Sequence, residues 1–229
     1  MKSAVMQPYL FPYLGYYQLV YAVDKFVFYD DVNFIKRGYI NRNNILVNGQ
    51  AQRFTVPVPG ATQNKKINEF DFSEDVRKVL KTIQMAYKKA PYFEFVYPII
   101  EDVLTLPERT VTTICKASVE QVFNYLEIDK HFYISSELNY ERDKSAADRL
   151  IDISKILSCS KYINSPGGIK LYDKDYFSEQ DVELSFIKMT AGSYSQNQSE
   201  FIPYLSMIDV LMWNNKAQIK KLMQQFELF

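Results

Sequence analysis

The chain has 229 residues, 47% of them hydrophobic and 24% charged, and its 27 basic and 27 acidic side chains leave a formal net charge of zero. Zero net charge excludes a bulk electrostatic attraction to DNA or to an anionic membrane. No apolar run approaches the roughly 20 residues that cross a bilayer, so we expect no membrane insertion. The length predicts a single domain over residues 1–229.

The thiol and imidazole groups are too few and too scattered to predict a metal centre. Cys115 and Cys159 lie in helix-like segments and form no CxxC pair, so we expect two buried free thiols. The lone histidine, His131, opens a strand-like segment, which favours a surface position over a catalytic one. Free thiols in a chain without a signal-peptide pattern predict a cytoplasmic protein.

The N-terminal segment VMQPYLFPYLGYY (residues 5–17) carries no charge. Pro8 and Pro12 exclude a central strand or an uninterrupted helix there, so we predict a stiff loop between a first strand and a helix that starts near Gly15. The run FVFYDD (residues 26–31) predicts a second strand that ends in carboxylates. A strand, a short helix and a strand imply a parallel pair with a right-handed crossover.

A hairpin and a helical subregion follow. Asn48-Gly49 between two strand-like segments predicts a tight hairpin turn. Residues 66–72, KINEFDF, alternate and predict a further extended segment. From residue 73 to residue 126 the pattern is helical, opened by a capping Ser73 and broken at Pro91. We place this inserted subregion at about 73–128.

The last hundred residues return to alternating strands and helices. We predict strands at 131–138, 161–165 and 182–189, a helix at 145–159 capped by Ser145, a turn and short helix at 166–181, and two helices over 201–229 that break at Asn214-Asn215. The apolar C-terminus covers either the core or a dimer partner. This alternation predicts a Rossmann-like α/β fold, with a mainly parallel sheet, flanking helices and the inserted hairpin and helical subregion.

Ligands of such sheets bind outside the carboxyl ends of the strands. The polar or Gly/Pro-rich segments at those ends are Met6–Pro8, Tyr29–Asp31, Ser135–Glu137 and Asn164–Gly168. The chain also contains 18 Tyr and 16 Phe but only 1 Trp. This excess of tyrosine reflects either an AT-rich coding sequence or a site that stacks rings and donates hydroxyls, as sugar- and nucleotide-binding clefts do.

The densest polar segment, Tyr29 to Asn43, offers the candidate catalytic groups. Asp30 and Asp31 could accept sugar hydroxyls, bind a divalent ion or take a proton from an attacking amine. Arg37 and Arg42 carry planar guanidinium groups suited to phosphate. The alternative is a polar strand-to-hairpin crossing whose charges pair among themselves.

Two further segments are candidates for substrate binding. Two glycines precede a short helix in Asn164–Gly168, where backbone N–H groups could face an anion; an ordinary turn explains them as well. Ser206 and Asp209 lie about one helical turn apart, after Tyr194 and Gln196. Helix capping and contacts between helices are the alternative explanation of these four residues.

The segments MQPYLFPYLGYY, DDVNFIKRGYINRN, GGIKLY and PYLSMID, in this order along nearly the whole chain, resemble the WbqC-like protein family. Many members of that family have a histidine before the Gln-Pro pair, where this chain has Met6. The resemblance implies a bacterial cytoplasmic protein of O-antigen and related surface-polysaccharide synthesis. It implies no particular reaction mechanism.

These observations predict a transferase that attaches an acyl or aminoacyl group to a nucleotide-linked amino sugar. The donor stays open between acyl-CoA, a carrier protein and an activated amino acid, and a homodimer is compatible with the sequence. The alternative is a noncatalytic protein of the same pathway that binds a sugar nucleotide or acts as a scaffold. We predict Asp30, Asp31 and Lys36 as catalytic residues. The predicted substrate-binding residues are Gln7, Pro8, Tyr9, Tyr13, Gly15, Tyr16, Asn33, Arg37, Asn41, Arg42, Asn43, Asn164, Ser165, Gly167, Gly168, Tyr194, Gln196, Ser206 and Asp209.

Overall fold

The computed structural model describes residues 1–198 and 200–229. In these residues six strands form one sheet, in the spatial order β5-β2-β1-β6-β7-β8. All neighbouring pairs are parallel except β7 and β8, which are antiparallel. The predicted Rossmann-like α/β fold is therefore confirmed. The strands are β1 (Lys2–Met6), β2 (Lys25–Phe28), β5 (His131–Ile134), β6 (Lys161–Asn164), β7 (Glu183–Met189) and β8 (Phe226–Leu228).

The strand order reverses in the middle of the sheet. The chain starts in β1, runs outward through β2 to β5, and returns past β1 to β6 before it runs outward again through β7. In doubly wound sheets ligands bind where the order reverses, outside the carboxyl ends of the two strands concerned. That position lies here at the ends of β1 and β6.

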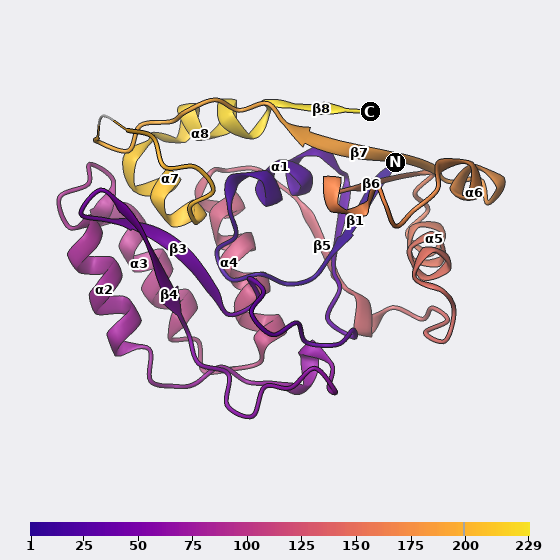
Figure 1. Ribbon diagram of the computed structural model, residues 1–229, viewed down its shortest axis with the longest axis horizontal. Helices are drawn as coiled ribbons and strands as arrows, with labels where there is room; N and C mark the ends of the chain where they lie inside the picture. Colours follow the sequence, from indigo (N-terminus) through magenta and orange to yellow (C-terminus); the bar gives the residue numbers. More distant parts are fainter. Residues whose placement is uncertain (199) are drawn as a thin grey trace.

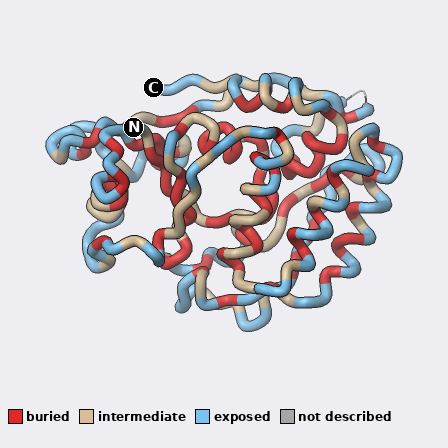
Figure 2. Tube along the Cα trace, turned by 180° about the vertical axis from the view of Figure 1, so that it is seen from behind, coloured by how far each residue is buried: buried red, intermediate tan, exposed pale blue. Residues whose placement is uncertain are grey.

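The two faces of the sheet pack into two separate apolar clusters, because side chains alternate along each strand. Ala4, Phe26 and Phe28 belong to one cluster, and Val5 and Val27 belong to the other. Helices cover both faces, and the buried segments gather between these layers (Figures 1 and 2). The first cluster includes residues of α1 (Leu14–Ala22), α4 (Val111–Tyr125) and α8 (Lys216–Met223), and the second includes residues of α5 (Ala146–Ile156) and α6 (Lys174–Glu179).

The inserted hairpin lies beside the sheet, next to a group of helices (Figure 1). Asn48 and Gly49 have φ values of 50° and 77°, which is the left-handed backbone that a two-residue hairpin turn of type I′ requires. The predicted hairpin is thus confirmed. It consists of β3 (Arg42–Val47) and β4 (Gln50–Thr55), and it contacts α2 (Arg77–Tyr87) and α7 (Met207–Trp213), while α3 (Phe93–Leu104) packs against α4 and α7.

Several predicted boundaries are confirmed by the capping groups. Ser145 Oγ accepts a hydrogen bond from the Asp148 N–H and starts α5. Asn215 caps α8 after the predicted break, and Pro91 lies between α2 and α3. Cys115 and Cys159 are buried free thiols, as expected. No helix within residues 1–198 and 200–229 is both long enough and apolar enough to cross a membrane.

Three local predictions are wrong. Residues 66–72 do not form one extended segment, because a 3₁₀ turn over Ile67–Glu69 interrupts them; the Lys66 N–H donates to Glu69 Oε2 at 2.6 Å at the start of this turn. Ser73 does not cap a helix: its Oγ accepts from the Asp75 N–H at 3.2 Å, and α2 begins later, at Arg77.

The third error concerns residues 201–229. The first of the two helices begins only at Met207, and Phe226–Leu228 is a strand instead of the end of a helix. This strand pairs with the outer edge of β7, which offers unpaired backbone groups that a helix could not satisfy.

Candidate functional site

The loop between β1 and α1 is fixed at Phe11. This residue is fully buried and has a φ of 40°, a left-handed conformation that bulky residues rarely adopt. Its N–H donates to Ser118 Oγ at 3.0 Å, and its carbonyl accepts hydrogen bonds from Asn43 Nδ2 at 2.8 Å and Ser206 Oγ at 2.6 Å. Side chains from α4, β3 and the start of α7 therefore hold one strained residue, and such strain concentrates at functional sites.

Residues on both sides of Phe11 are anchored as well. The Pro12 carbonyl accepts from the Met207 N–H at 2.8 Å, and Tyr16 Oη donates to the Gln7 carbonyl at 2.9 Å. The loop after β1 is thus a fixed platform at the carboxyl end of that strand, as the two prolines predict.

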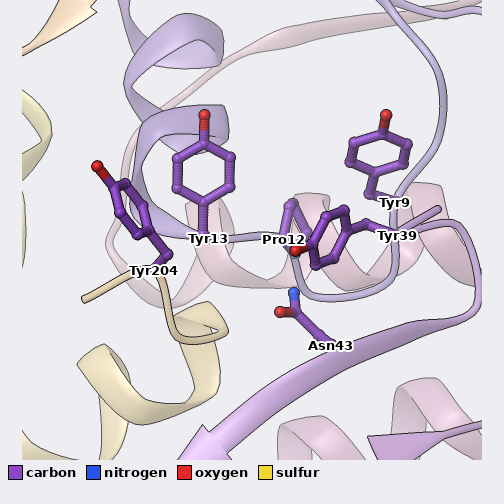
Figure 3. A pocket seen from close by; sticks show the side chains of 6 residues that line it. All are labelled: Tyr9, Pro12, Tyr13, Tyr39, Asn43 and Tyr204. Atoms are coloured by element: carbon purple, nitrogen blue, oxygen red, sulfur yellow. The ribbon is translucent and has the colours of Figure 1, made fainter. Parts of the chain in front are cut away.

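Four tyrosines stand around this platform (Figure 3). Tyr9 and Tyr13 rise from the platform itself, with Tyr39 beside Tyr9 and Tyr204 beside Tyr13. The ring centroids of Tyr9 and Tyr39 are 6.3 Å apart, and those of Tyr13 and Tyr204 are 6.1 Å apart. Together with Pro12 and Asn43 these rings line an open, mostly apolar hollow.

This hollow adjoins three others that share its tyrosines, and we call the connected space the tyrosine cleft. One part runs past Met6, Tyr16 and Ser165 to the end of β6. Another part continues beyond Met6 over the switch between β1 and β6, and it is lined by Gln7, Tyr29, Asn164, Ser165, Gly167, Gly168, Leu171 and Tyr172, among others. The cleft therefore lies where a doubly wound sheet binds its ligand.

Gly15 allows the Tyr13 ring to lie against the first turn of α1. A Cβ atom added at Gly15 would lie 2.5 Å from Tyr13 Cε2 and 3.0 Å from its hydroxyl oxygen, well inside van der Waals contact. Gly168 has a similar function beside Asn164, because a Cβ there would lie 2.7 Å from Asn164 Nδ2. Both glycines are needed for close approach of a cleft side chain.

Two phenols of the cleft, those of Tyr9 and Tyr13, are neutral at physiological pH. Burial raises the pKa of Tyr9 and of Tyr13 above the usual value, and neighbouring phenols raise it further. Each hydroxyl therefore keeps its proton and can donate one hydrogen bond while it accepts another.

Asp30 forms part of a polar joint between the ends of β2 and β5. Its carboxylate is buried and accepts hydrogen bonds from Ser135 Oγ, the Ser136 N–H, Ser136 Oγ and Thr112 Oγ1, at 2.9–3.2 Å. These donors come from the 3₁₀ turn after β5 and from α4. Both oxygens are thus occupied by protein groups.

Asp31 belongs to the same joint. Tyr140 Oη lies 2.8 Å from each of its carboxylate oxygens, Arg142 Nε donates to Oδ2 at 2.8 Å, and Ser135 Oγ contacts Oδ1 at 2.5 Å. Only 3% of the Asp31 side chain is exposed. The carboxylate pair therefore lies beside the cleft without lining it, and its charge is compensated by Arg142 from outside the predicted block.

The basic residues of the predicted block lie on the connection to the hairpin. Lys36 and Arg37 are exposed, as is Asn33. Arg42 Nε donates to the Gly38 carbonyl at 2.9 Å, and Asn41 Nδ2 donates to the Val56 carbonyl at 2.9 Å. The side chains of Arg42 and Asn41 thus bond to backbone carbonyls near the hairpin and do not line the cleft.

Asp209 on α7 is a buried carboxylate held only by neutral donors. Tyr87 Oη, Tyr194 Oη and Gln196 Nε2 donate to it at 2.8, 3.0 and 3.1 Å. Burial raises the pKa of this carboxyl to about 6, and the three hydrogen bonds only partly oppose that shift. Because Tyr194 also lines the cleft, the network links α2 and α7 to the cleft wall.

We expect Asp209 to make the protein less stable as the pH rises from 4 to 7. A carboxyl with a pKa near 3.8 in the unfolded chain and about 6 in the folded protein favours folding most when it is protonated, below pH 4. The stabilisation disappears as the pH rises through 6, by about 3 kcal/mol. Denaturant unfolding of the wild type and of Asp209→Asn at pH 4.5–7.5 measures the difference. Parallel curves for both proteins would contradict this prediction.

The structure brings about half of the predicted binding residues to the cleft. Its lining includes Gln7, Tyr9, Tyr13, Gly15, Tyr16, Asn43, Asn164, Ser165, Gly167, Gly168 and Tyr194. Among the described residues, the remaining candidates lie behind or away from that lining; they are Pro8, Asp30, Asp31, Asn33, Lys36, Arg37, Asn41, Arg42, Gln196, Ser206 and Asp209.

Sequence reasoning missed several lining residues. Tyr39 and Tyr204 lie within recognised segments, and their aromatic character was the available signal. Tyr172 also borders the cleft, and Met6 and Tyr29 line it from the strand-end segments that the sequence predicted. The positions of Tyr39, Tyr172 and Tyr204 follow from strand order and loop packing, which no local pattern indicates.

The comparisons with known proteins confirm the family resemblance that the sequence segments indicated. Residues 7–221 match the WbqC-like protein family. An uncharacterized protein of Mycobacterium tuberculosis (strain ATCC 25618 / H37Rv), Rv1507c, is 24% identical over 215 residues, which make up 92% of this chain and 92% of that protein. No solved structure matches. Because the match covers nearly the whole described chain, including most of the cleft lining, the protein is a member of the WbqC-like protein family.

Proposed function

We propose that the protein binds a nucleotide-linked amino sugar of bacterial surface-polysaccharide synthesis in the tyrosine cleft and transfers an acyl or aminoacyl group to its amine. The observation that carries the proposal is the position of the cleft, over the β1–β6 switch, with Tyr9, Tyr13, Tyr39 and Tyr204 along it. Flat aromatic faces stack on sugar rings and bases, and neutral phenols exchange hydrogen bonds with hydroxyls.

Group transfer needs an activated acyl donor, such as a thioester. The amine nitrogen forms a bond to the acyl carbon, the bond from that carbon to the leaving group breaks with its electron pair, and the amine proton goes to the leaving group or to solvent. The carbonyl oxygen carries negative charge in between. The protonated phenols of Tyr9 and Tyr13 are suited to donate hydrogen bonds to that oxygen.

One observation favours the alternative, a protein that binds the sugar nucleotide without changing it. The described residues that line the tyrosine cleft include no Asp, Glu or His that could take the amine proton. Asp30 and Asp31 are engaged in their polar joint. In a transferase the amine would therefore lose its proton to the leaving group or to water.

Two exposed aromatic residues provide a matched test of the site. Tyr204 is 65% exposed at the cleft, and Phe95 is 67% exposed on α3, away from it. We expect Tyr204→Ala to weaken the binding of nucleotide-linked amino sugars by about 10-fold or more, since one stacking contact contributes about 1–3 kcal/mol. Phe95→Ala should leave the affinity unchanged, and both variants should unfold at the temperature of the wild type.

Calorimetric titration with a panel of sugar nucleotides measures the affinities, and mass spectrometry after incubation with acyl and aminoacyl donors detects the transfer. Equal affinities for the two variants would reject the tyrosine cleft as the binding site. Binding without a product for any donor would reject the transferase and leave the noncatalytic alternative.

A further inference from the structure

Two buried polar atoms near the β6 end of the tyrosine cleft have no protein partner. Among the described residues, Tyr29 Oη and Arg149 Nε are inaccessible to solvent and form no hydrogen bond. Tyr29 lines the cleft, and the guanidinium carbon of Arg149 lies 5.8 Å from the centroid of the Tyr29 ring. Buried polar groups are normally paired in folded proteins, so two unpaired atoms beside a hollow indicate groups that a ligand can use.

The charge of Arg149 is not compensated by an ion pair. It takes part in none of the salt bridges formed within residues 1–198 and 200–229. The nearest acids along α5 have other partners, because Asp148 accepts from Tyr176 Oη and Asp152 pairs with Lys144 at 2.9 Å. Asp31, near Tyr29, pairs with Arg142.

The positive charge acts on both phenols at this end of the cleft. Burial raises the pKa of Tyr29 and of Tyr172, and the charge of Arg149 partly opposes that rise in each case. Both tyrosines line the same hollow as Ser165, Gly167 and Gly168. The guanidinium group therefore lies close to a pocket wall that contains hydroxyls and two glycines among apolar side chains such as Leu150 and Leu171.

We infer that the Tyr29–Gly168 end of the tyrosine cleft is an anion subsite that takes the diphosphate of a nucleoside diphosphate sugar. Arg149 supplies the positive charge, and the hydroxyls of Tyr29, Tyr172 and Ser165 supply hydrogen bonds. Gly167 allows a phosphate to approach the backbone. The identity of the ligand rests on the proposed function, whereas the binding of a diphosphate group does not.

Lys188 is the competing cation, because it borders the adjoining hollow. Lys188 is exposed, whereas Arg149 is half-buried and its Nε is inaccessible to solvent. A partly buried charge is less screened by water and salt, and a guanidinium group matches phosphate oxygens better than an ammonium group does. These differences favour Arg149.

Calorimetric titration of the full chain with inorganic pyrophosphate, a panel of nucleoside diphosphates and the matching nucleosides tests the subsite. We expect Arg149→Gln to weaken the binding of pyrophosphate and of nucleoside diphosphates by about 10-fold or more, the effect of one charge-assisted hydrogen bond. Nucleoside affinities should stay unchanged. Lys155→Gln, which removes an exposed charge from the same helix, is the matched control and should have no effect. Lys188→Gln should change the affinity by less than Arg149→Gln.

Tyr29→Phe tests the subsite without a change of charge. Because the Tyr29 hydroxyl forms no close hydrogen bond within the protein and has only the Tyr140 hydroxyl nearby, its removal should change the thermal stability little and lower pyrophosphate affinity several-fold. Circular dichroism confirms that each variant is folded, and Arg149→Lys, which keeps the charge, should retain part of the affinity.

The outcomes separate the subsite from the proposed function. No binding of pyrophosphate or nucleoside diphosphates to the wild type would overturn the subsite, as would equal affinities for folded Arg149→Gln and the wild type. A larger effect of Lys188→Gln would overturn the assignment to Arg149. Diphosphate binding that depends on Arg149, without affinity for amino-sugar nucleotides, would support the subsite and reject the proposed function.

Discussion

Gly15→Ala should remove most of the ligand affinity of the tyrosine cleft while the protein stays folded. The new Cβ would overlap the Tyr13 ring, 2.5 Å from Cε2, and this ring is the end of a flexible side chain that can rotate away. Its displacement removes one stacking surface from the three hollows that Tyr13 lines. The expected loss is about 10- to 100-fold, corresponding to about 1–3 kcal/mol of stacking.

The free energy of unfolding should stay nearly unchanged in Gly15→Ala or increase slightly. Gly15 is the second residue of α1, and alanine is favoured over glycine in helices by up to about 1 kcal/mol. The matched control is Gly192→Ala, since Gly192 also lines the cleft but a Cβ there meets nothing within 4 Å. Sugar-nucleotide titration and thermal unfolding of the two variants measure both effects. If Gly15→Ala bound as tightly as Gly192→Ala, the Tyr13 ring would not be part of the binding site.

The edge of the sheet that carries the site could be predicted from the sequence. Each of the segments at Met6, Tyr29, Ser135 and Asn164 lies at the end of a parallel strand, where apolar residues give way to polar residues, glycine or proline. The fixed loop after β1 was also predictable, because Pro8 and Pro12 exclude regular structure there. Both predictions depend on local residue types, which sequence patterns report directly.

Which strand ends stay open could not be predicted. The ends of β2 and β5 are neighbours in the sheet, and their polar side chains bond to each other: Asp30 accepts from Ser135. The ends of β1 and β6 flank the reversal of strand order and leave a cleft. Strand order is a property of the whole chain. For this reason Asp30, with two carboxylate oxygens in a polar segment, was indistinguishable in sequence from a catalytic base.

For a similar reason, the sequence did not indicate which residue supplies the positive charge near the tyrosine cleft. Arg37 and Arg42 belong to the recognisable polar block, but the hairpin connection carries them away from the cleft lining. Arg149 lies in an ordinary amphipathic helix, and only the packing of α5 against β1 and β6 brings it near Tyr29. The apolar spacing of that helix predicts its buried side and says nothing about its polar residues.

Asp31→Ala should be among the most destabilising changes in the chain. The Asp31 carboxylate is 3% exposed at the side chain, pairs with Arg142 at 2.8 Å and accepts hydrogen bonds from Tyr140. Its removal leaves the Arg142 Nε–H and the buried Tyr140 phenol without their acceptor, while the terminal nitrogens of Arg142 still donate to backbone carbonyls. Because the Arg142 side chain is 36% exposed, the expected loss lies at the lower end of the range for a buried pair, at about 3 kcal/mol. Denaturant unfolding at neutral pH measures the loss.

Arg37→Ala is the control from the same polar block, because Arg37 is exposed and its φ of 63° is equally unfavourable for both residues. Its unfolding curve should match that of the wild type. A structural role and a catalytic role of Asp31 can be distinguished at a low temperature, at which Asp31→Ala is still folded. If the role of Asp31 is only structural, ligand affinity and turnover at low temperature should stay within about threefold of the wild type. Asp31 does not line the cleft, and a substitution remote from a preformed site has little effect on it. Loss of turnover in a fully folded Asp31→Ala protein, with ligand affinity retained, would instead make Asp31 the missing base.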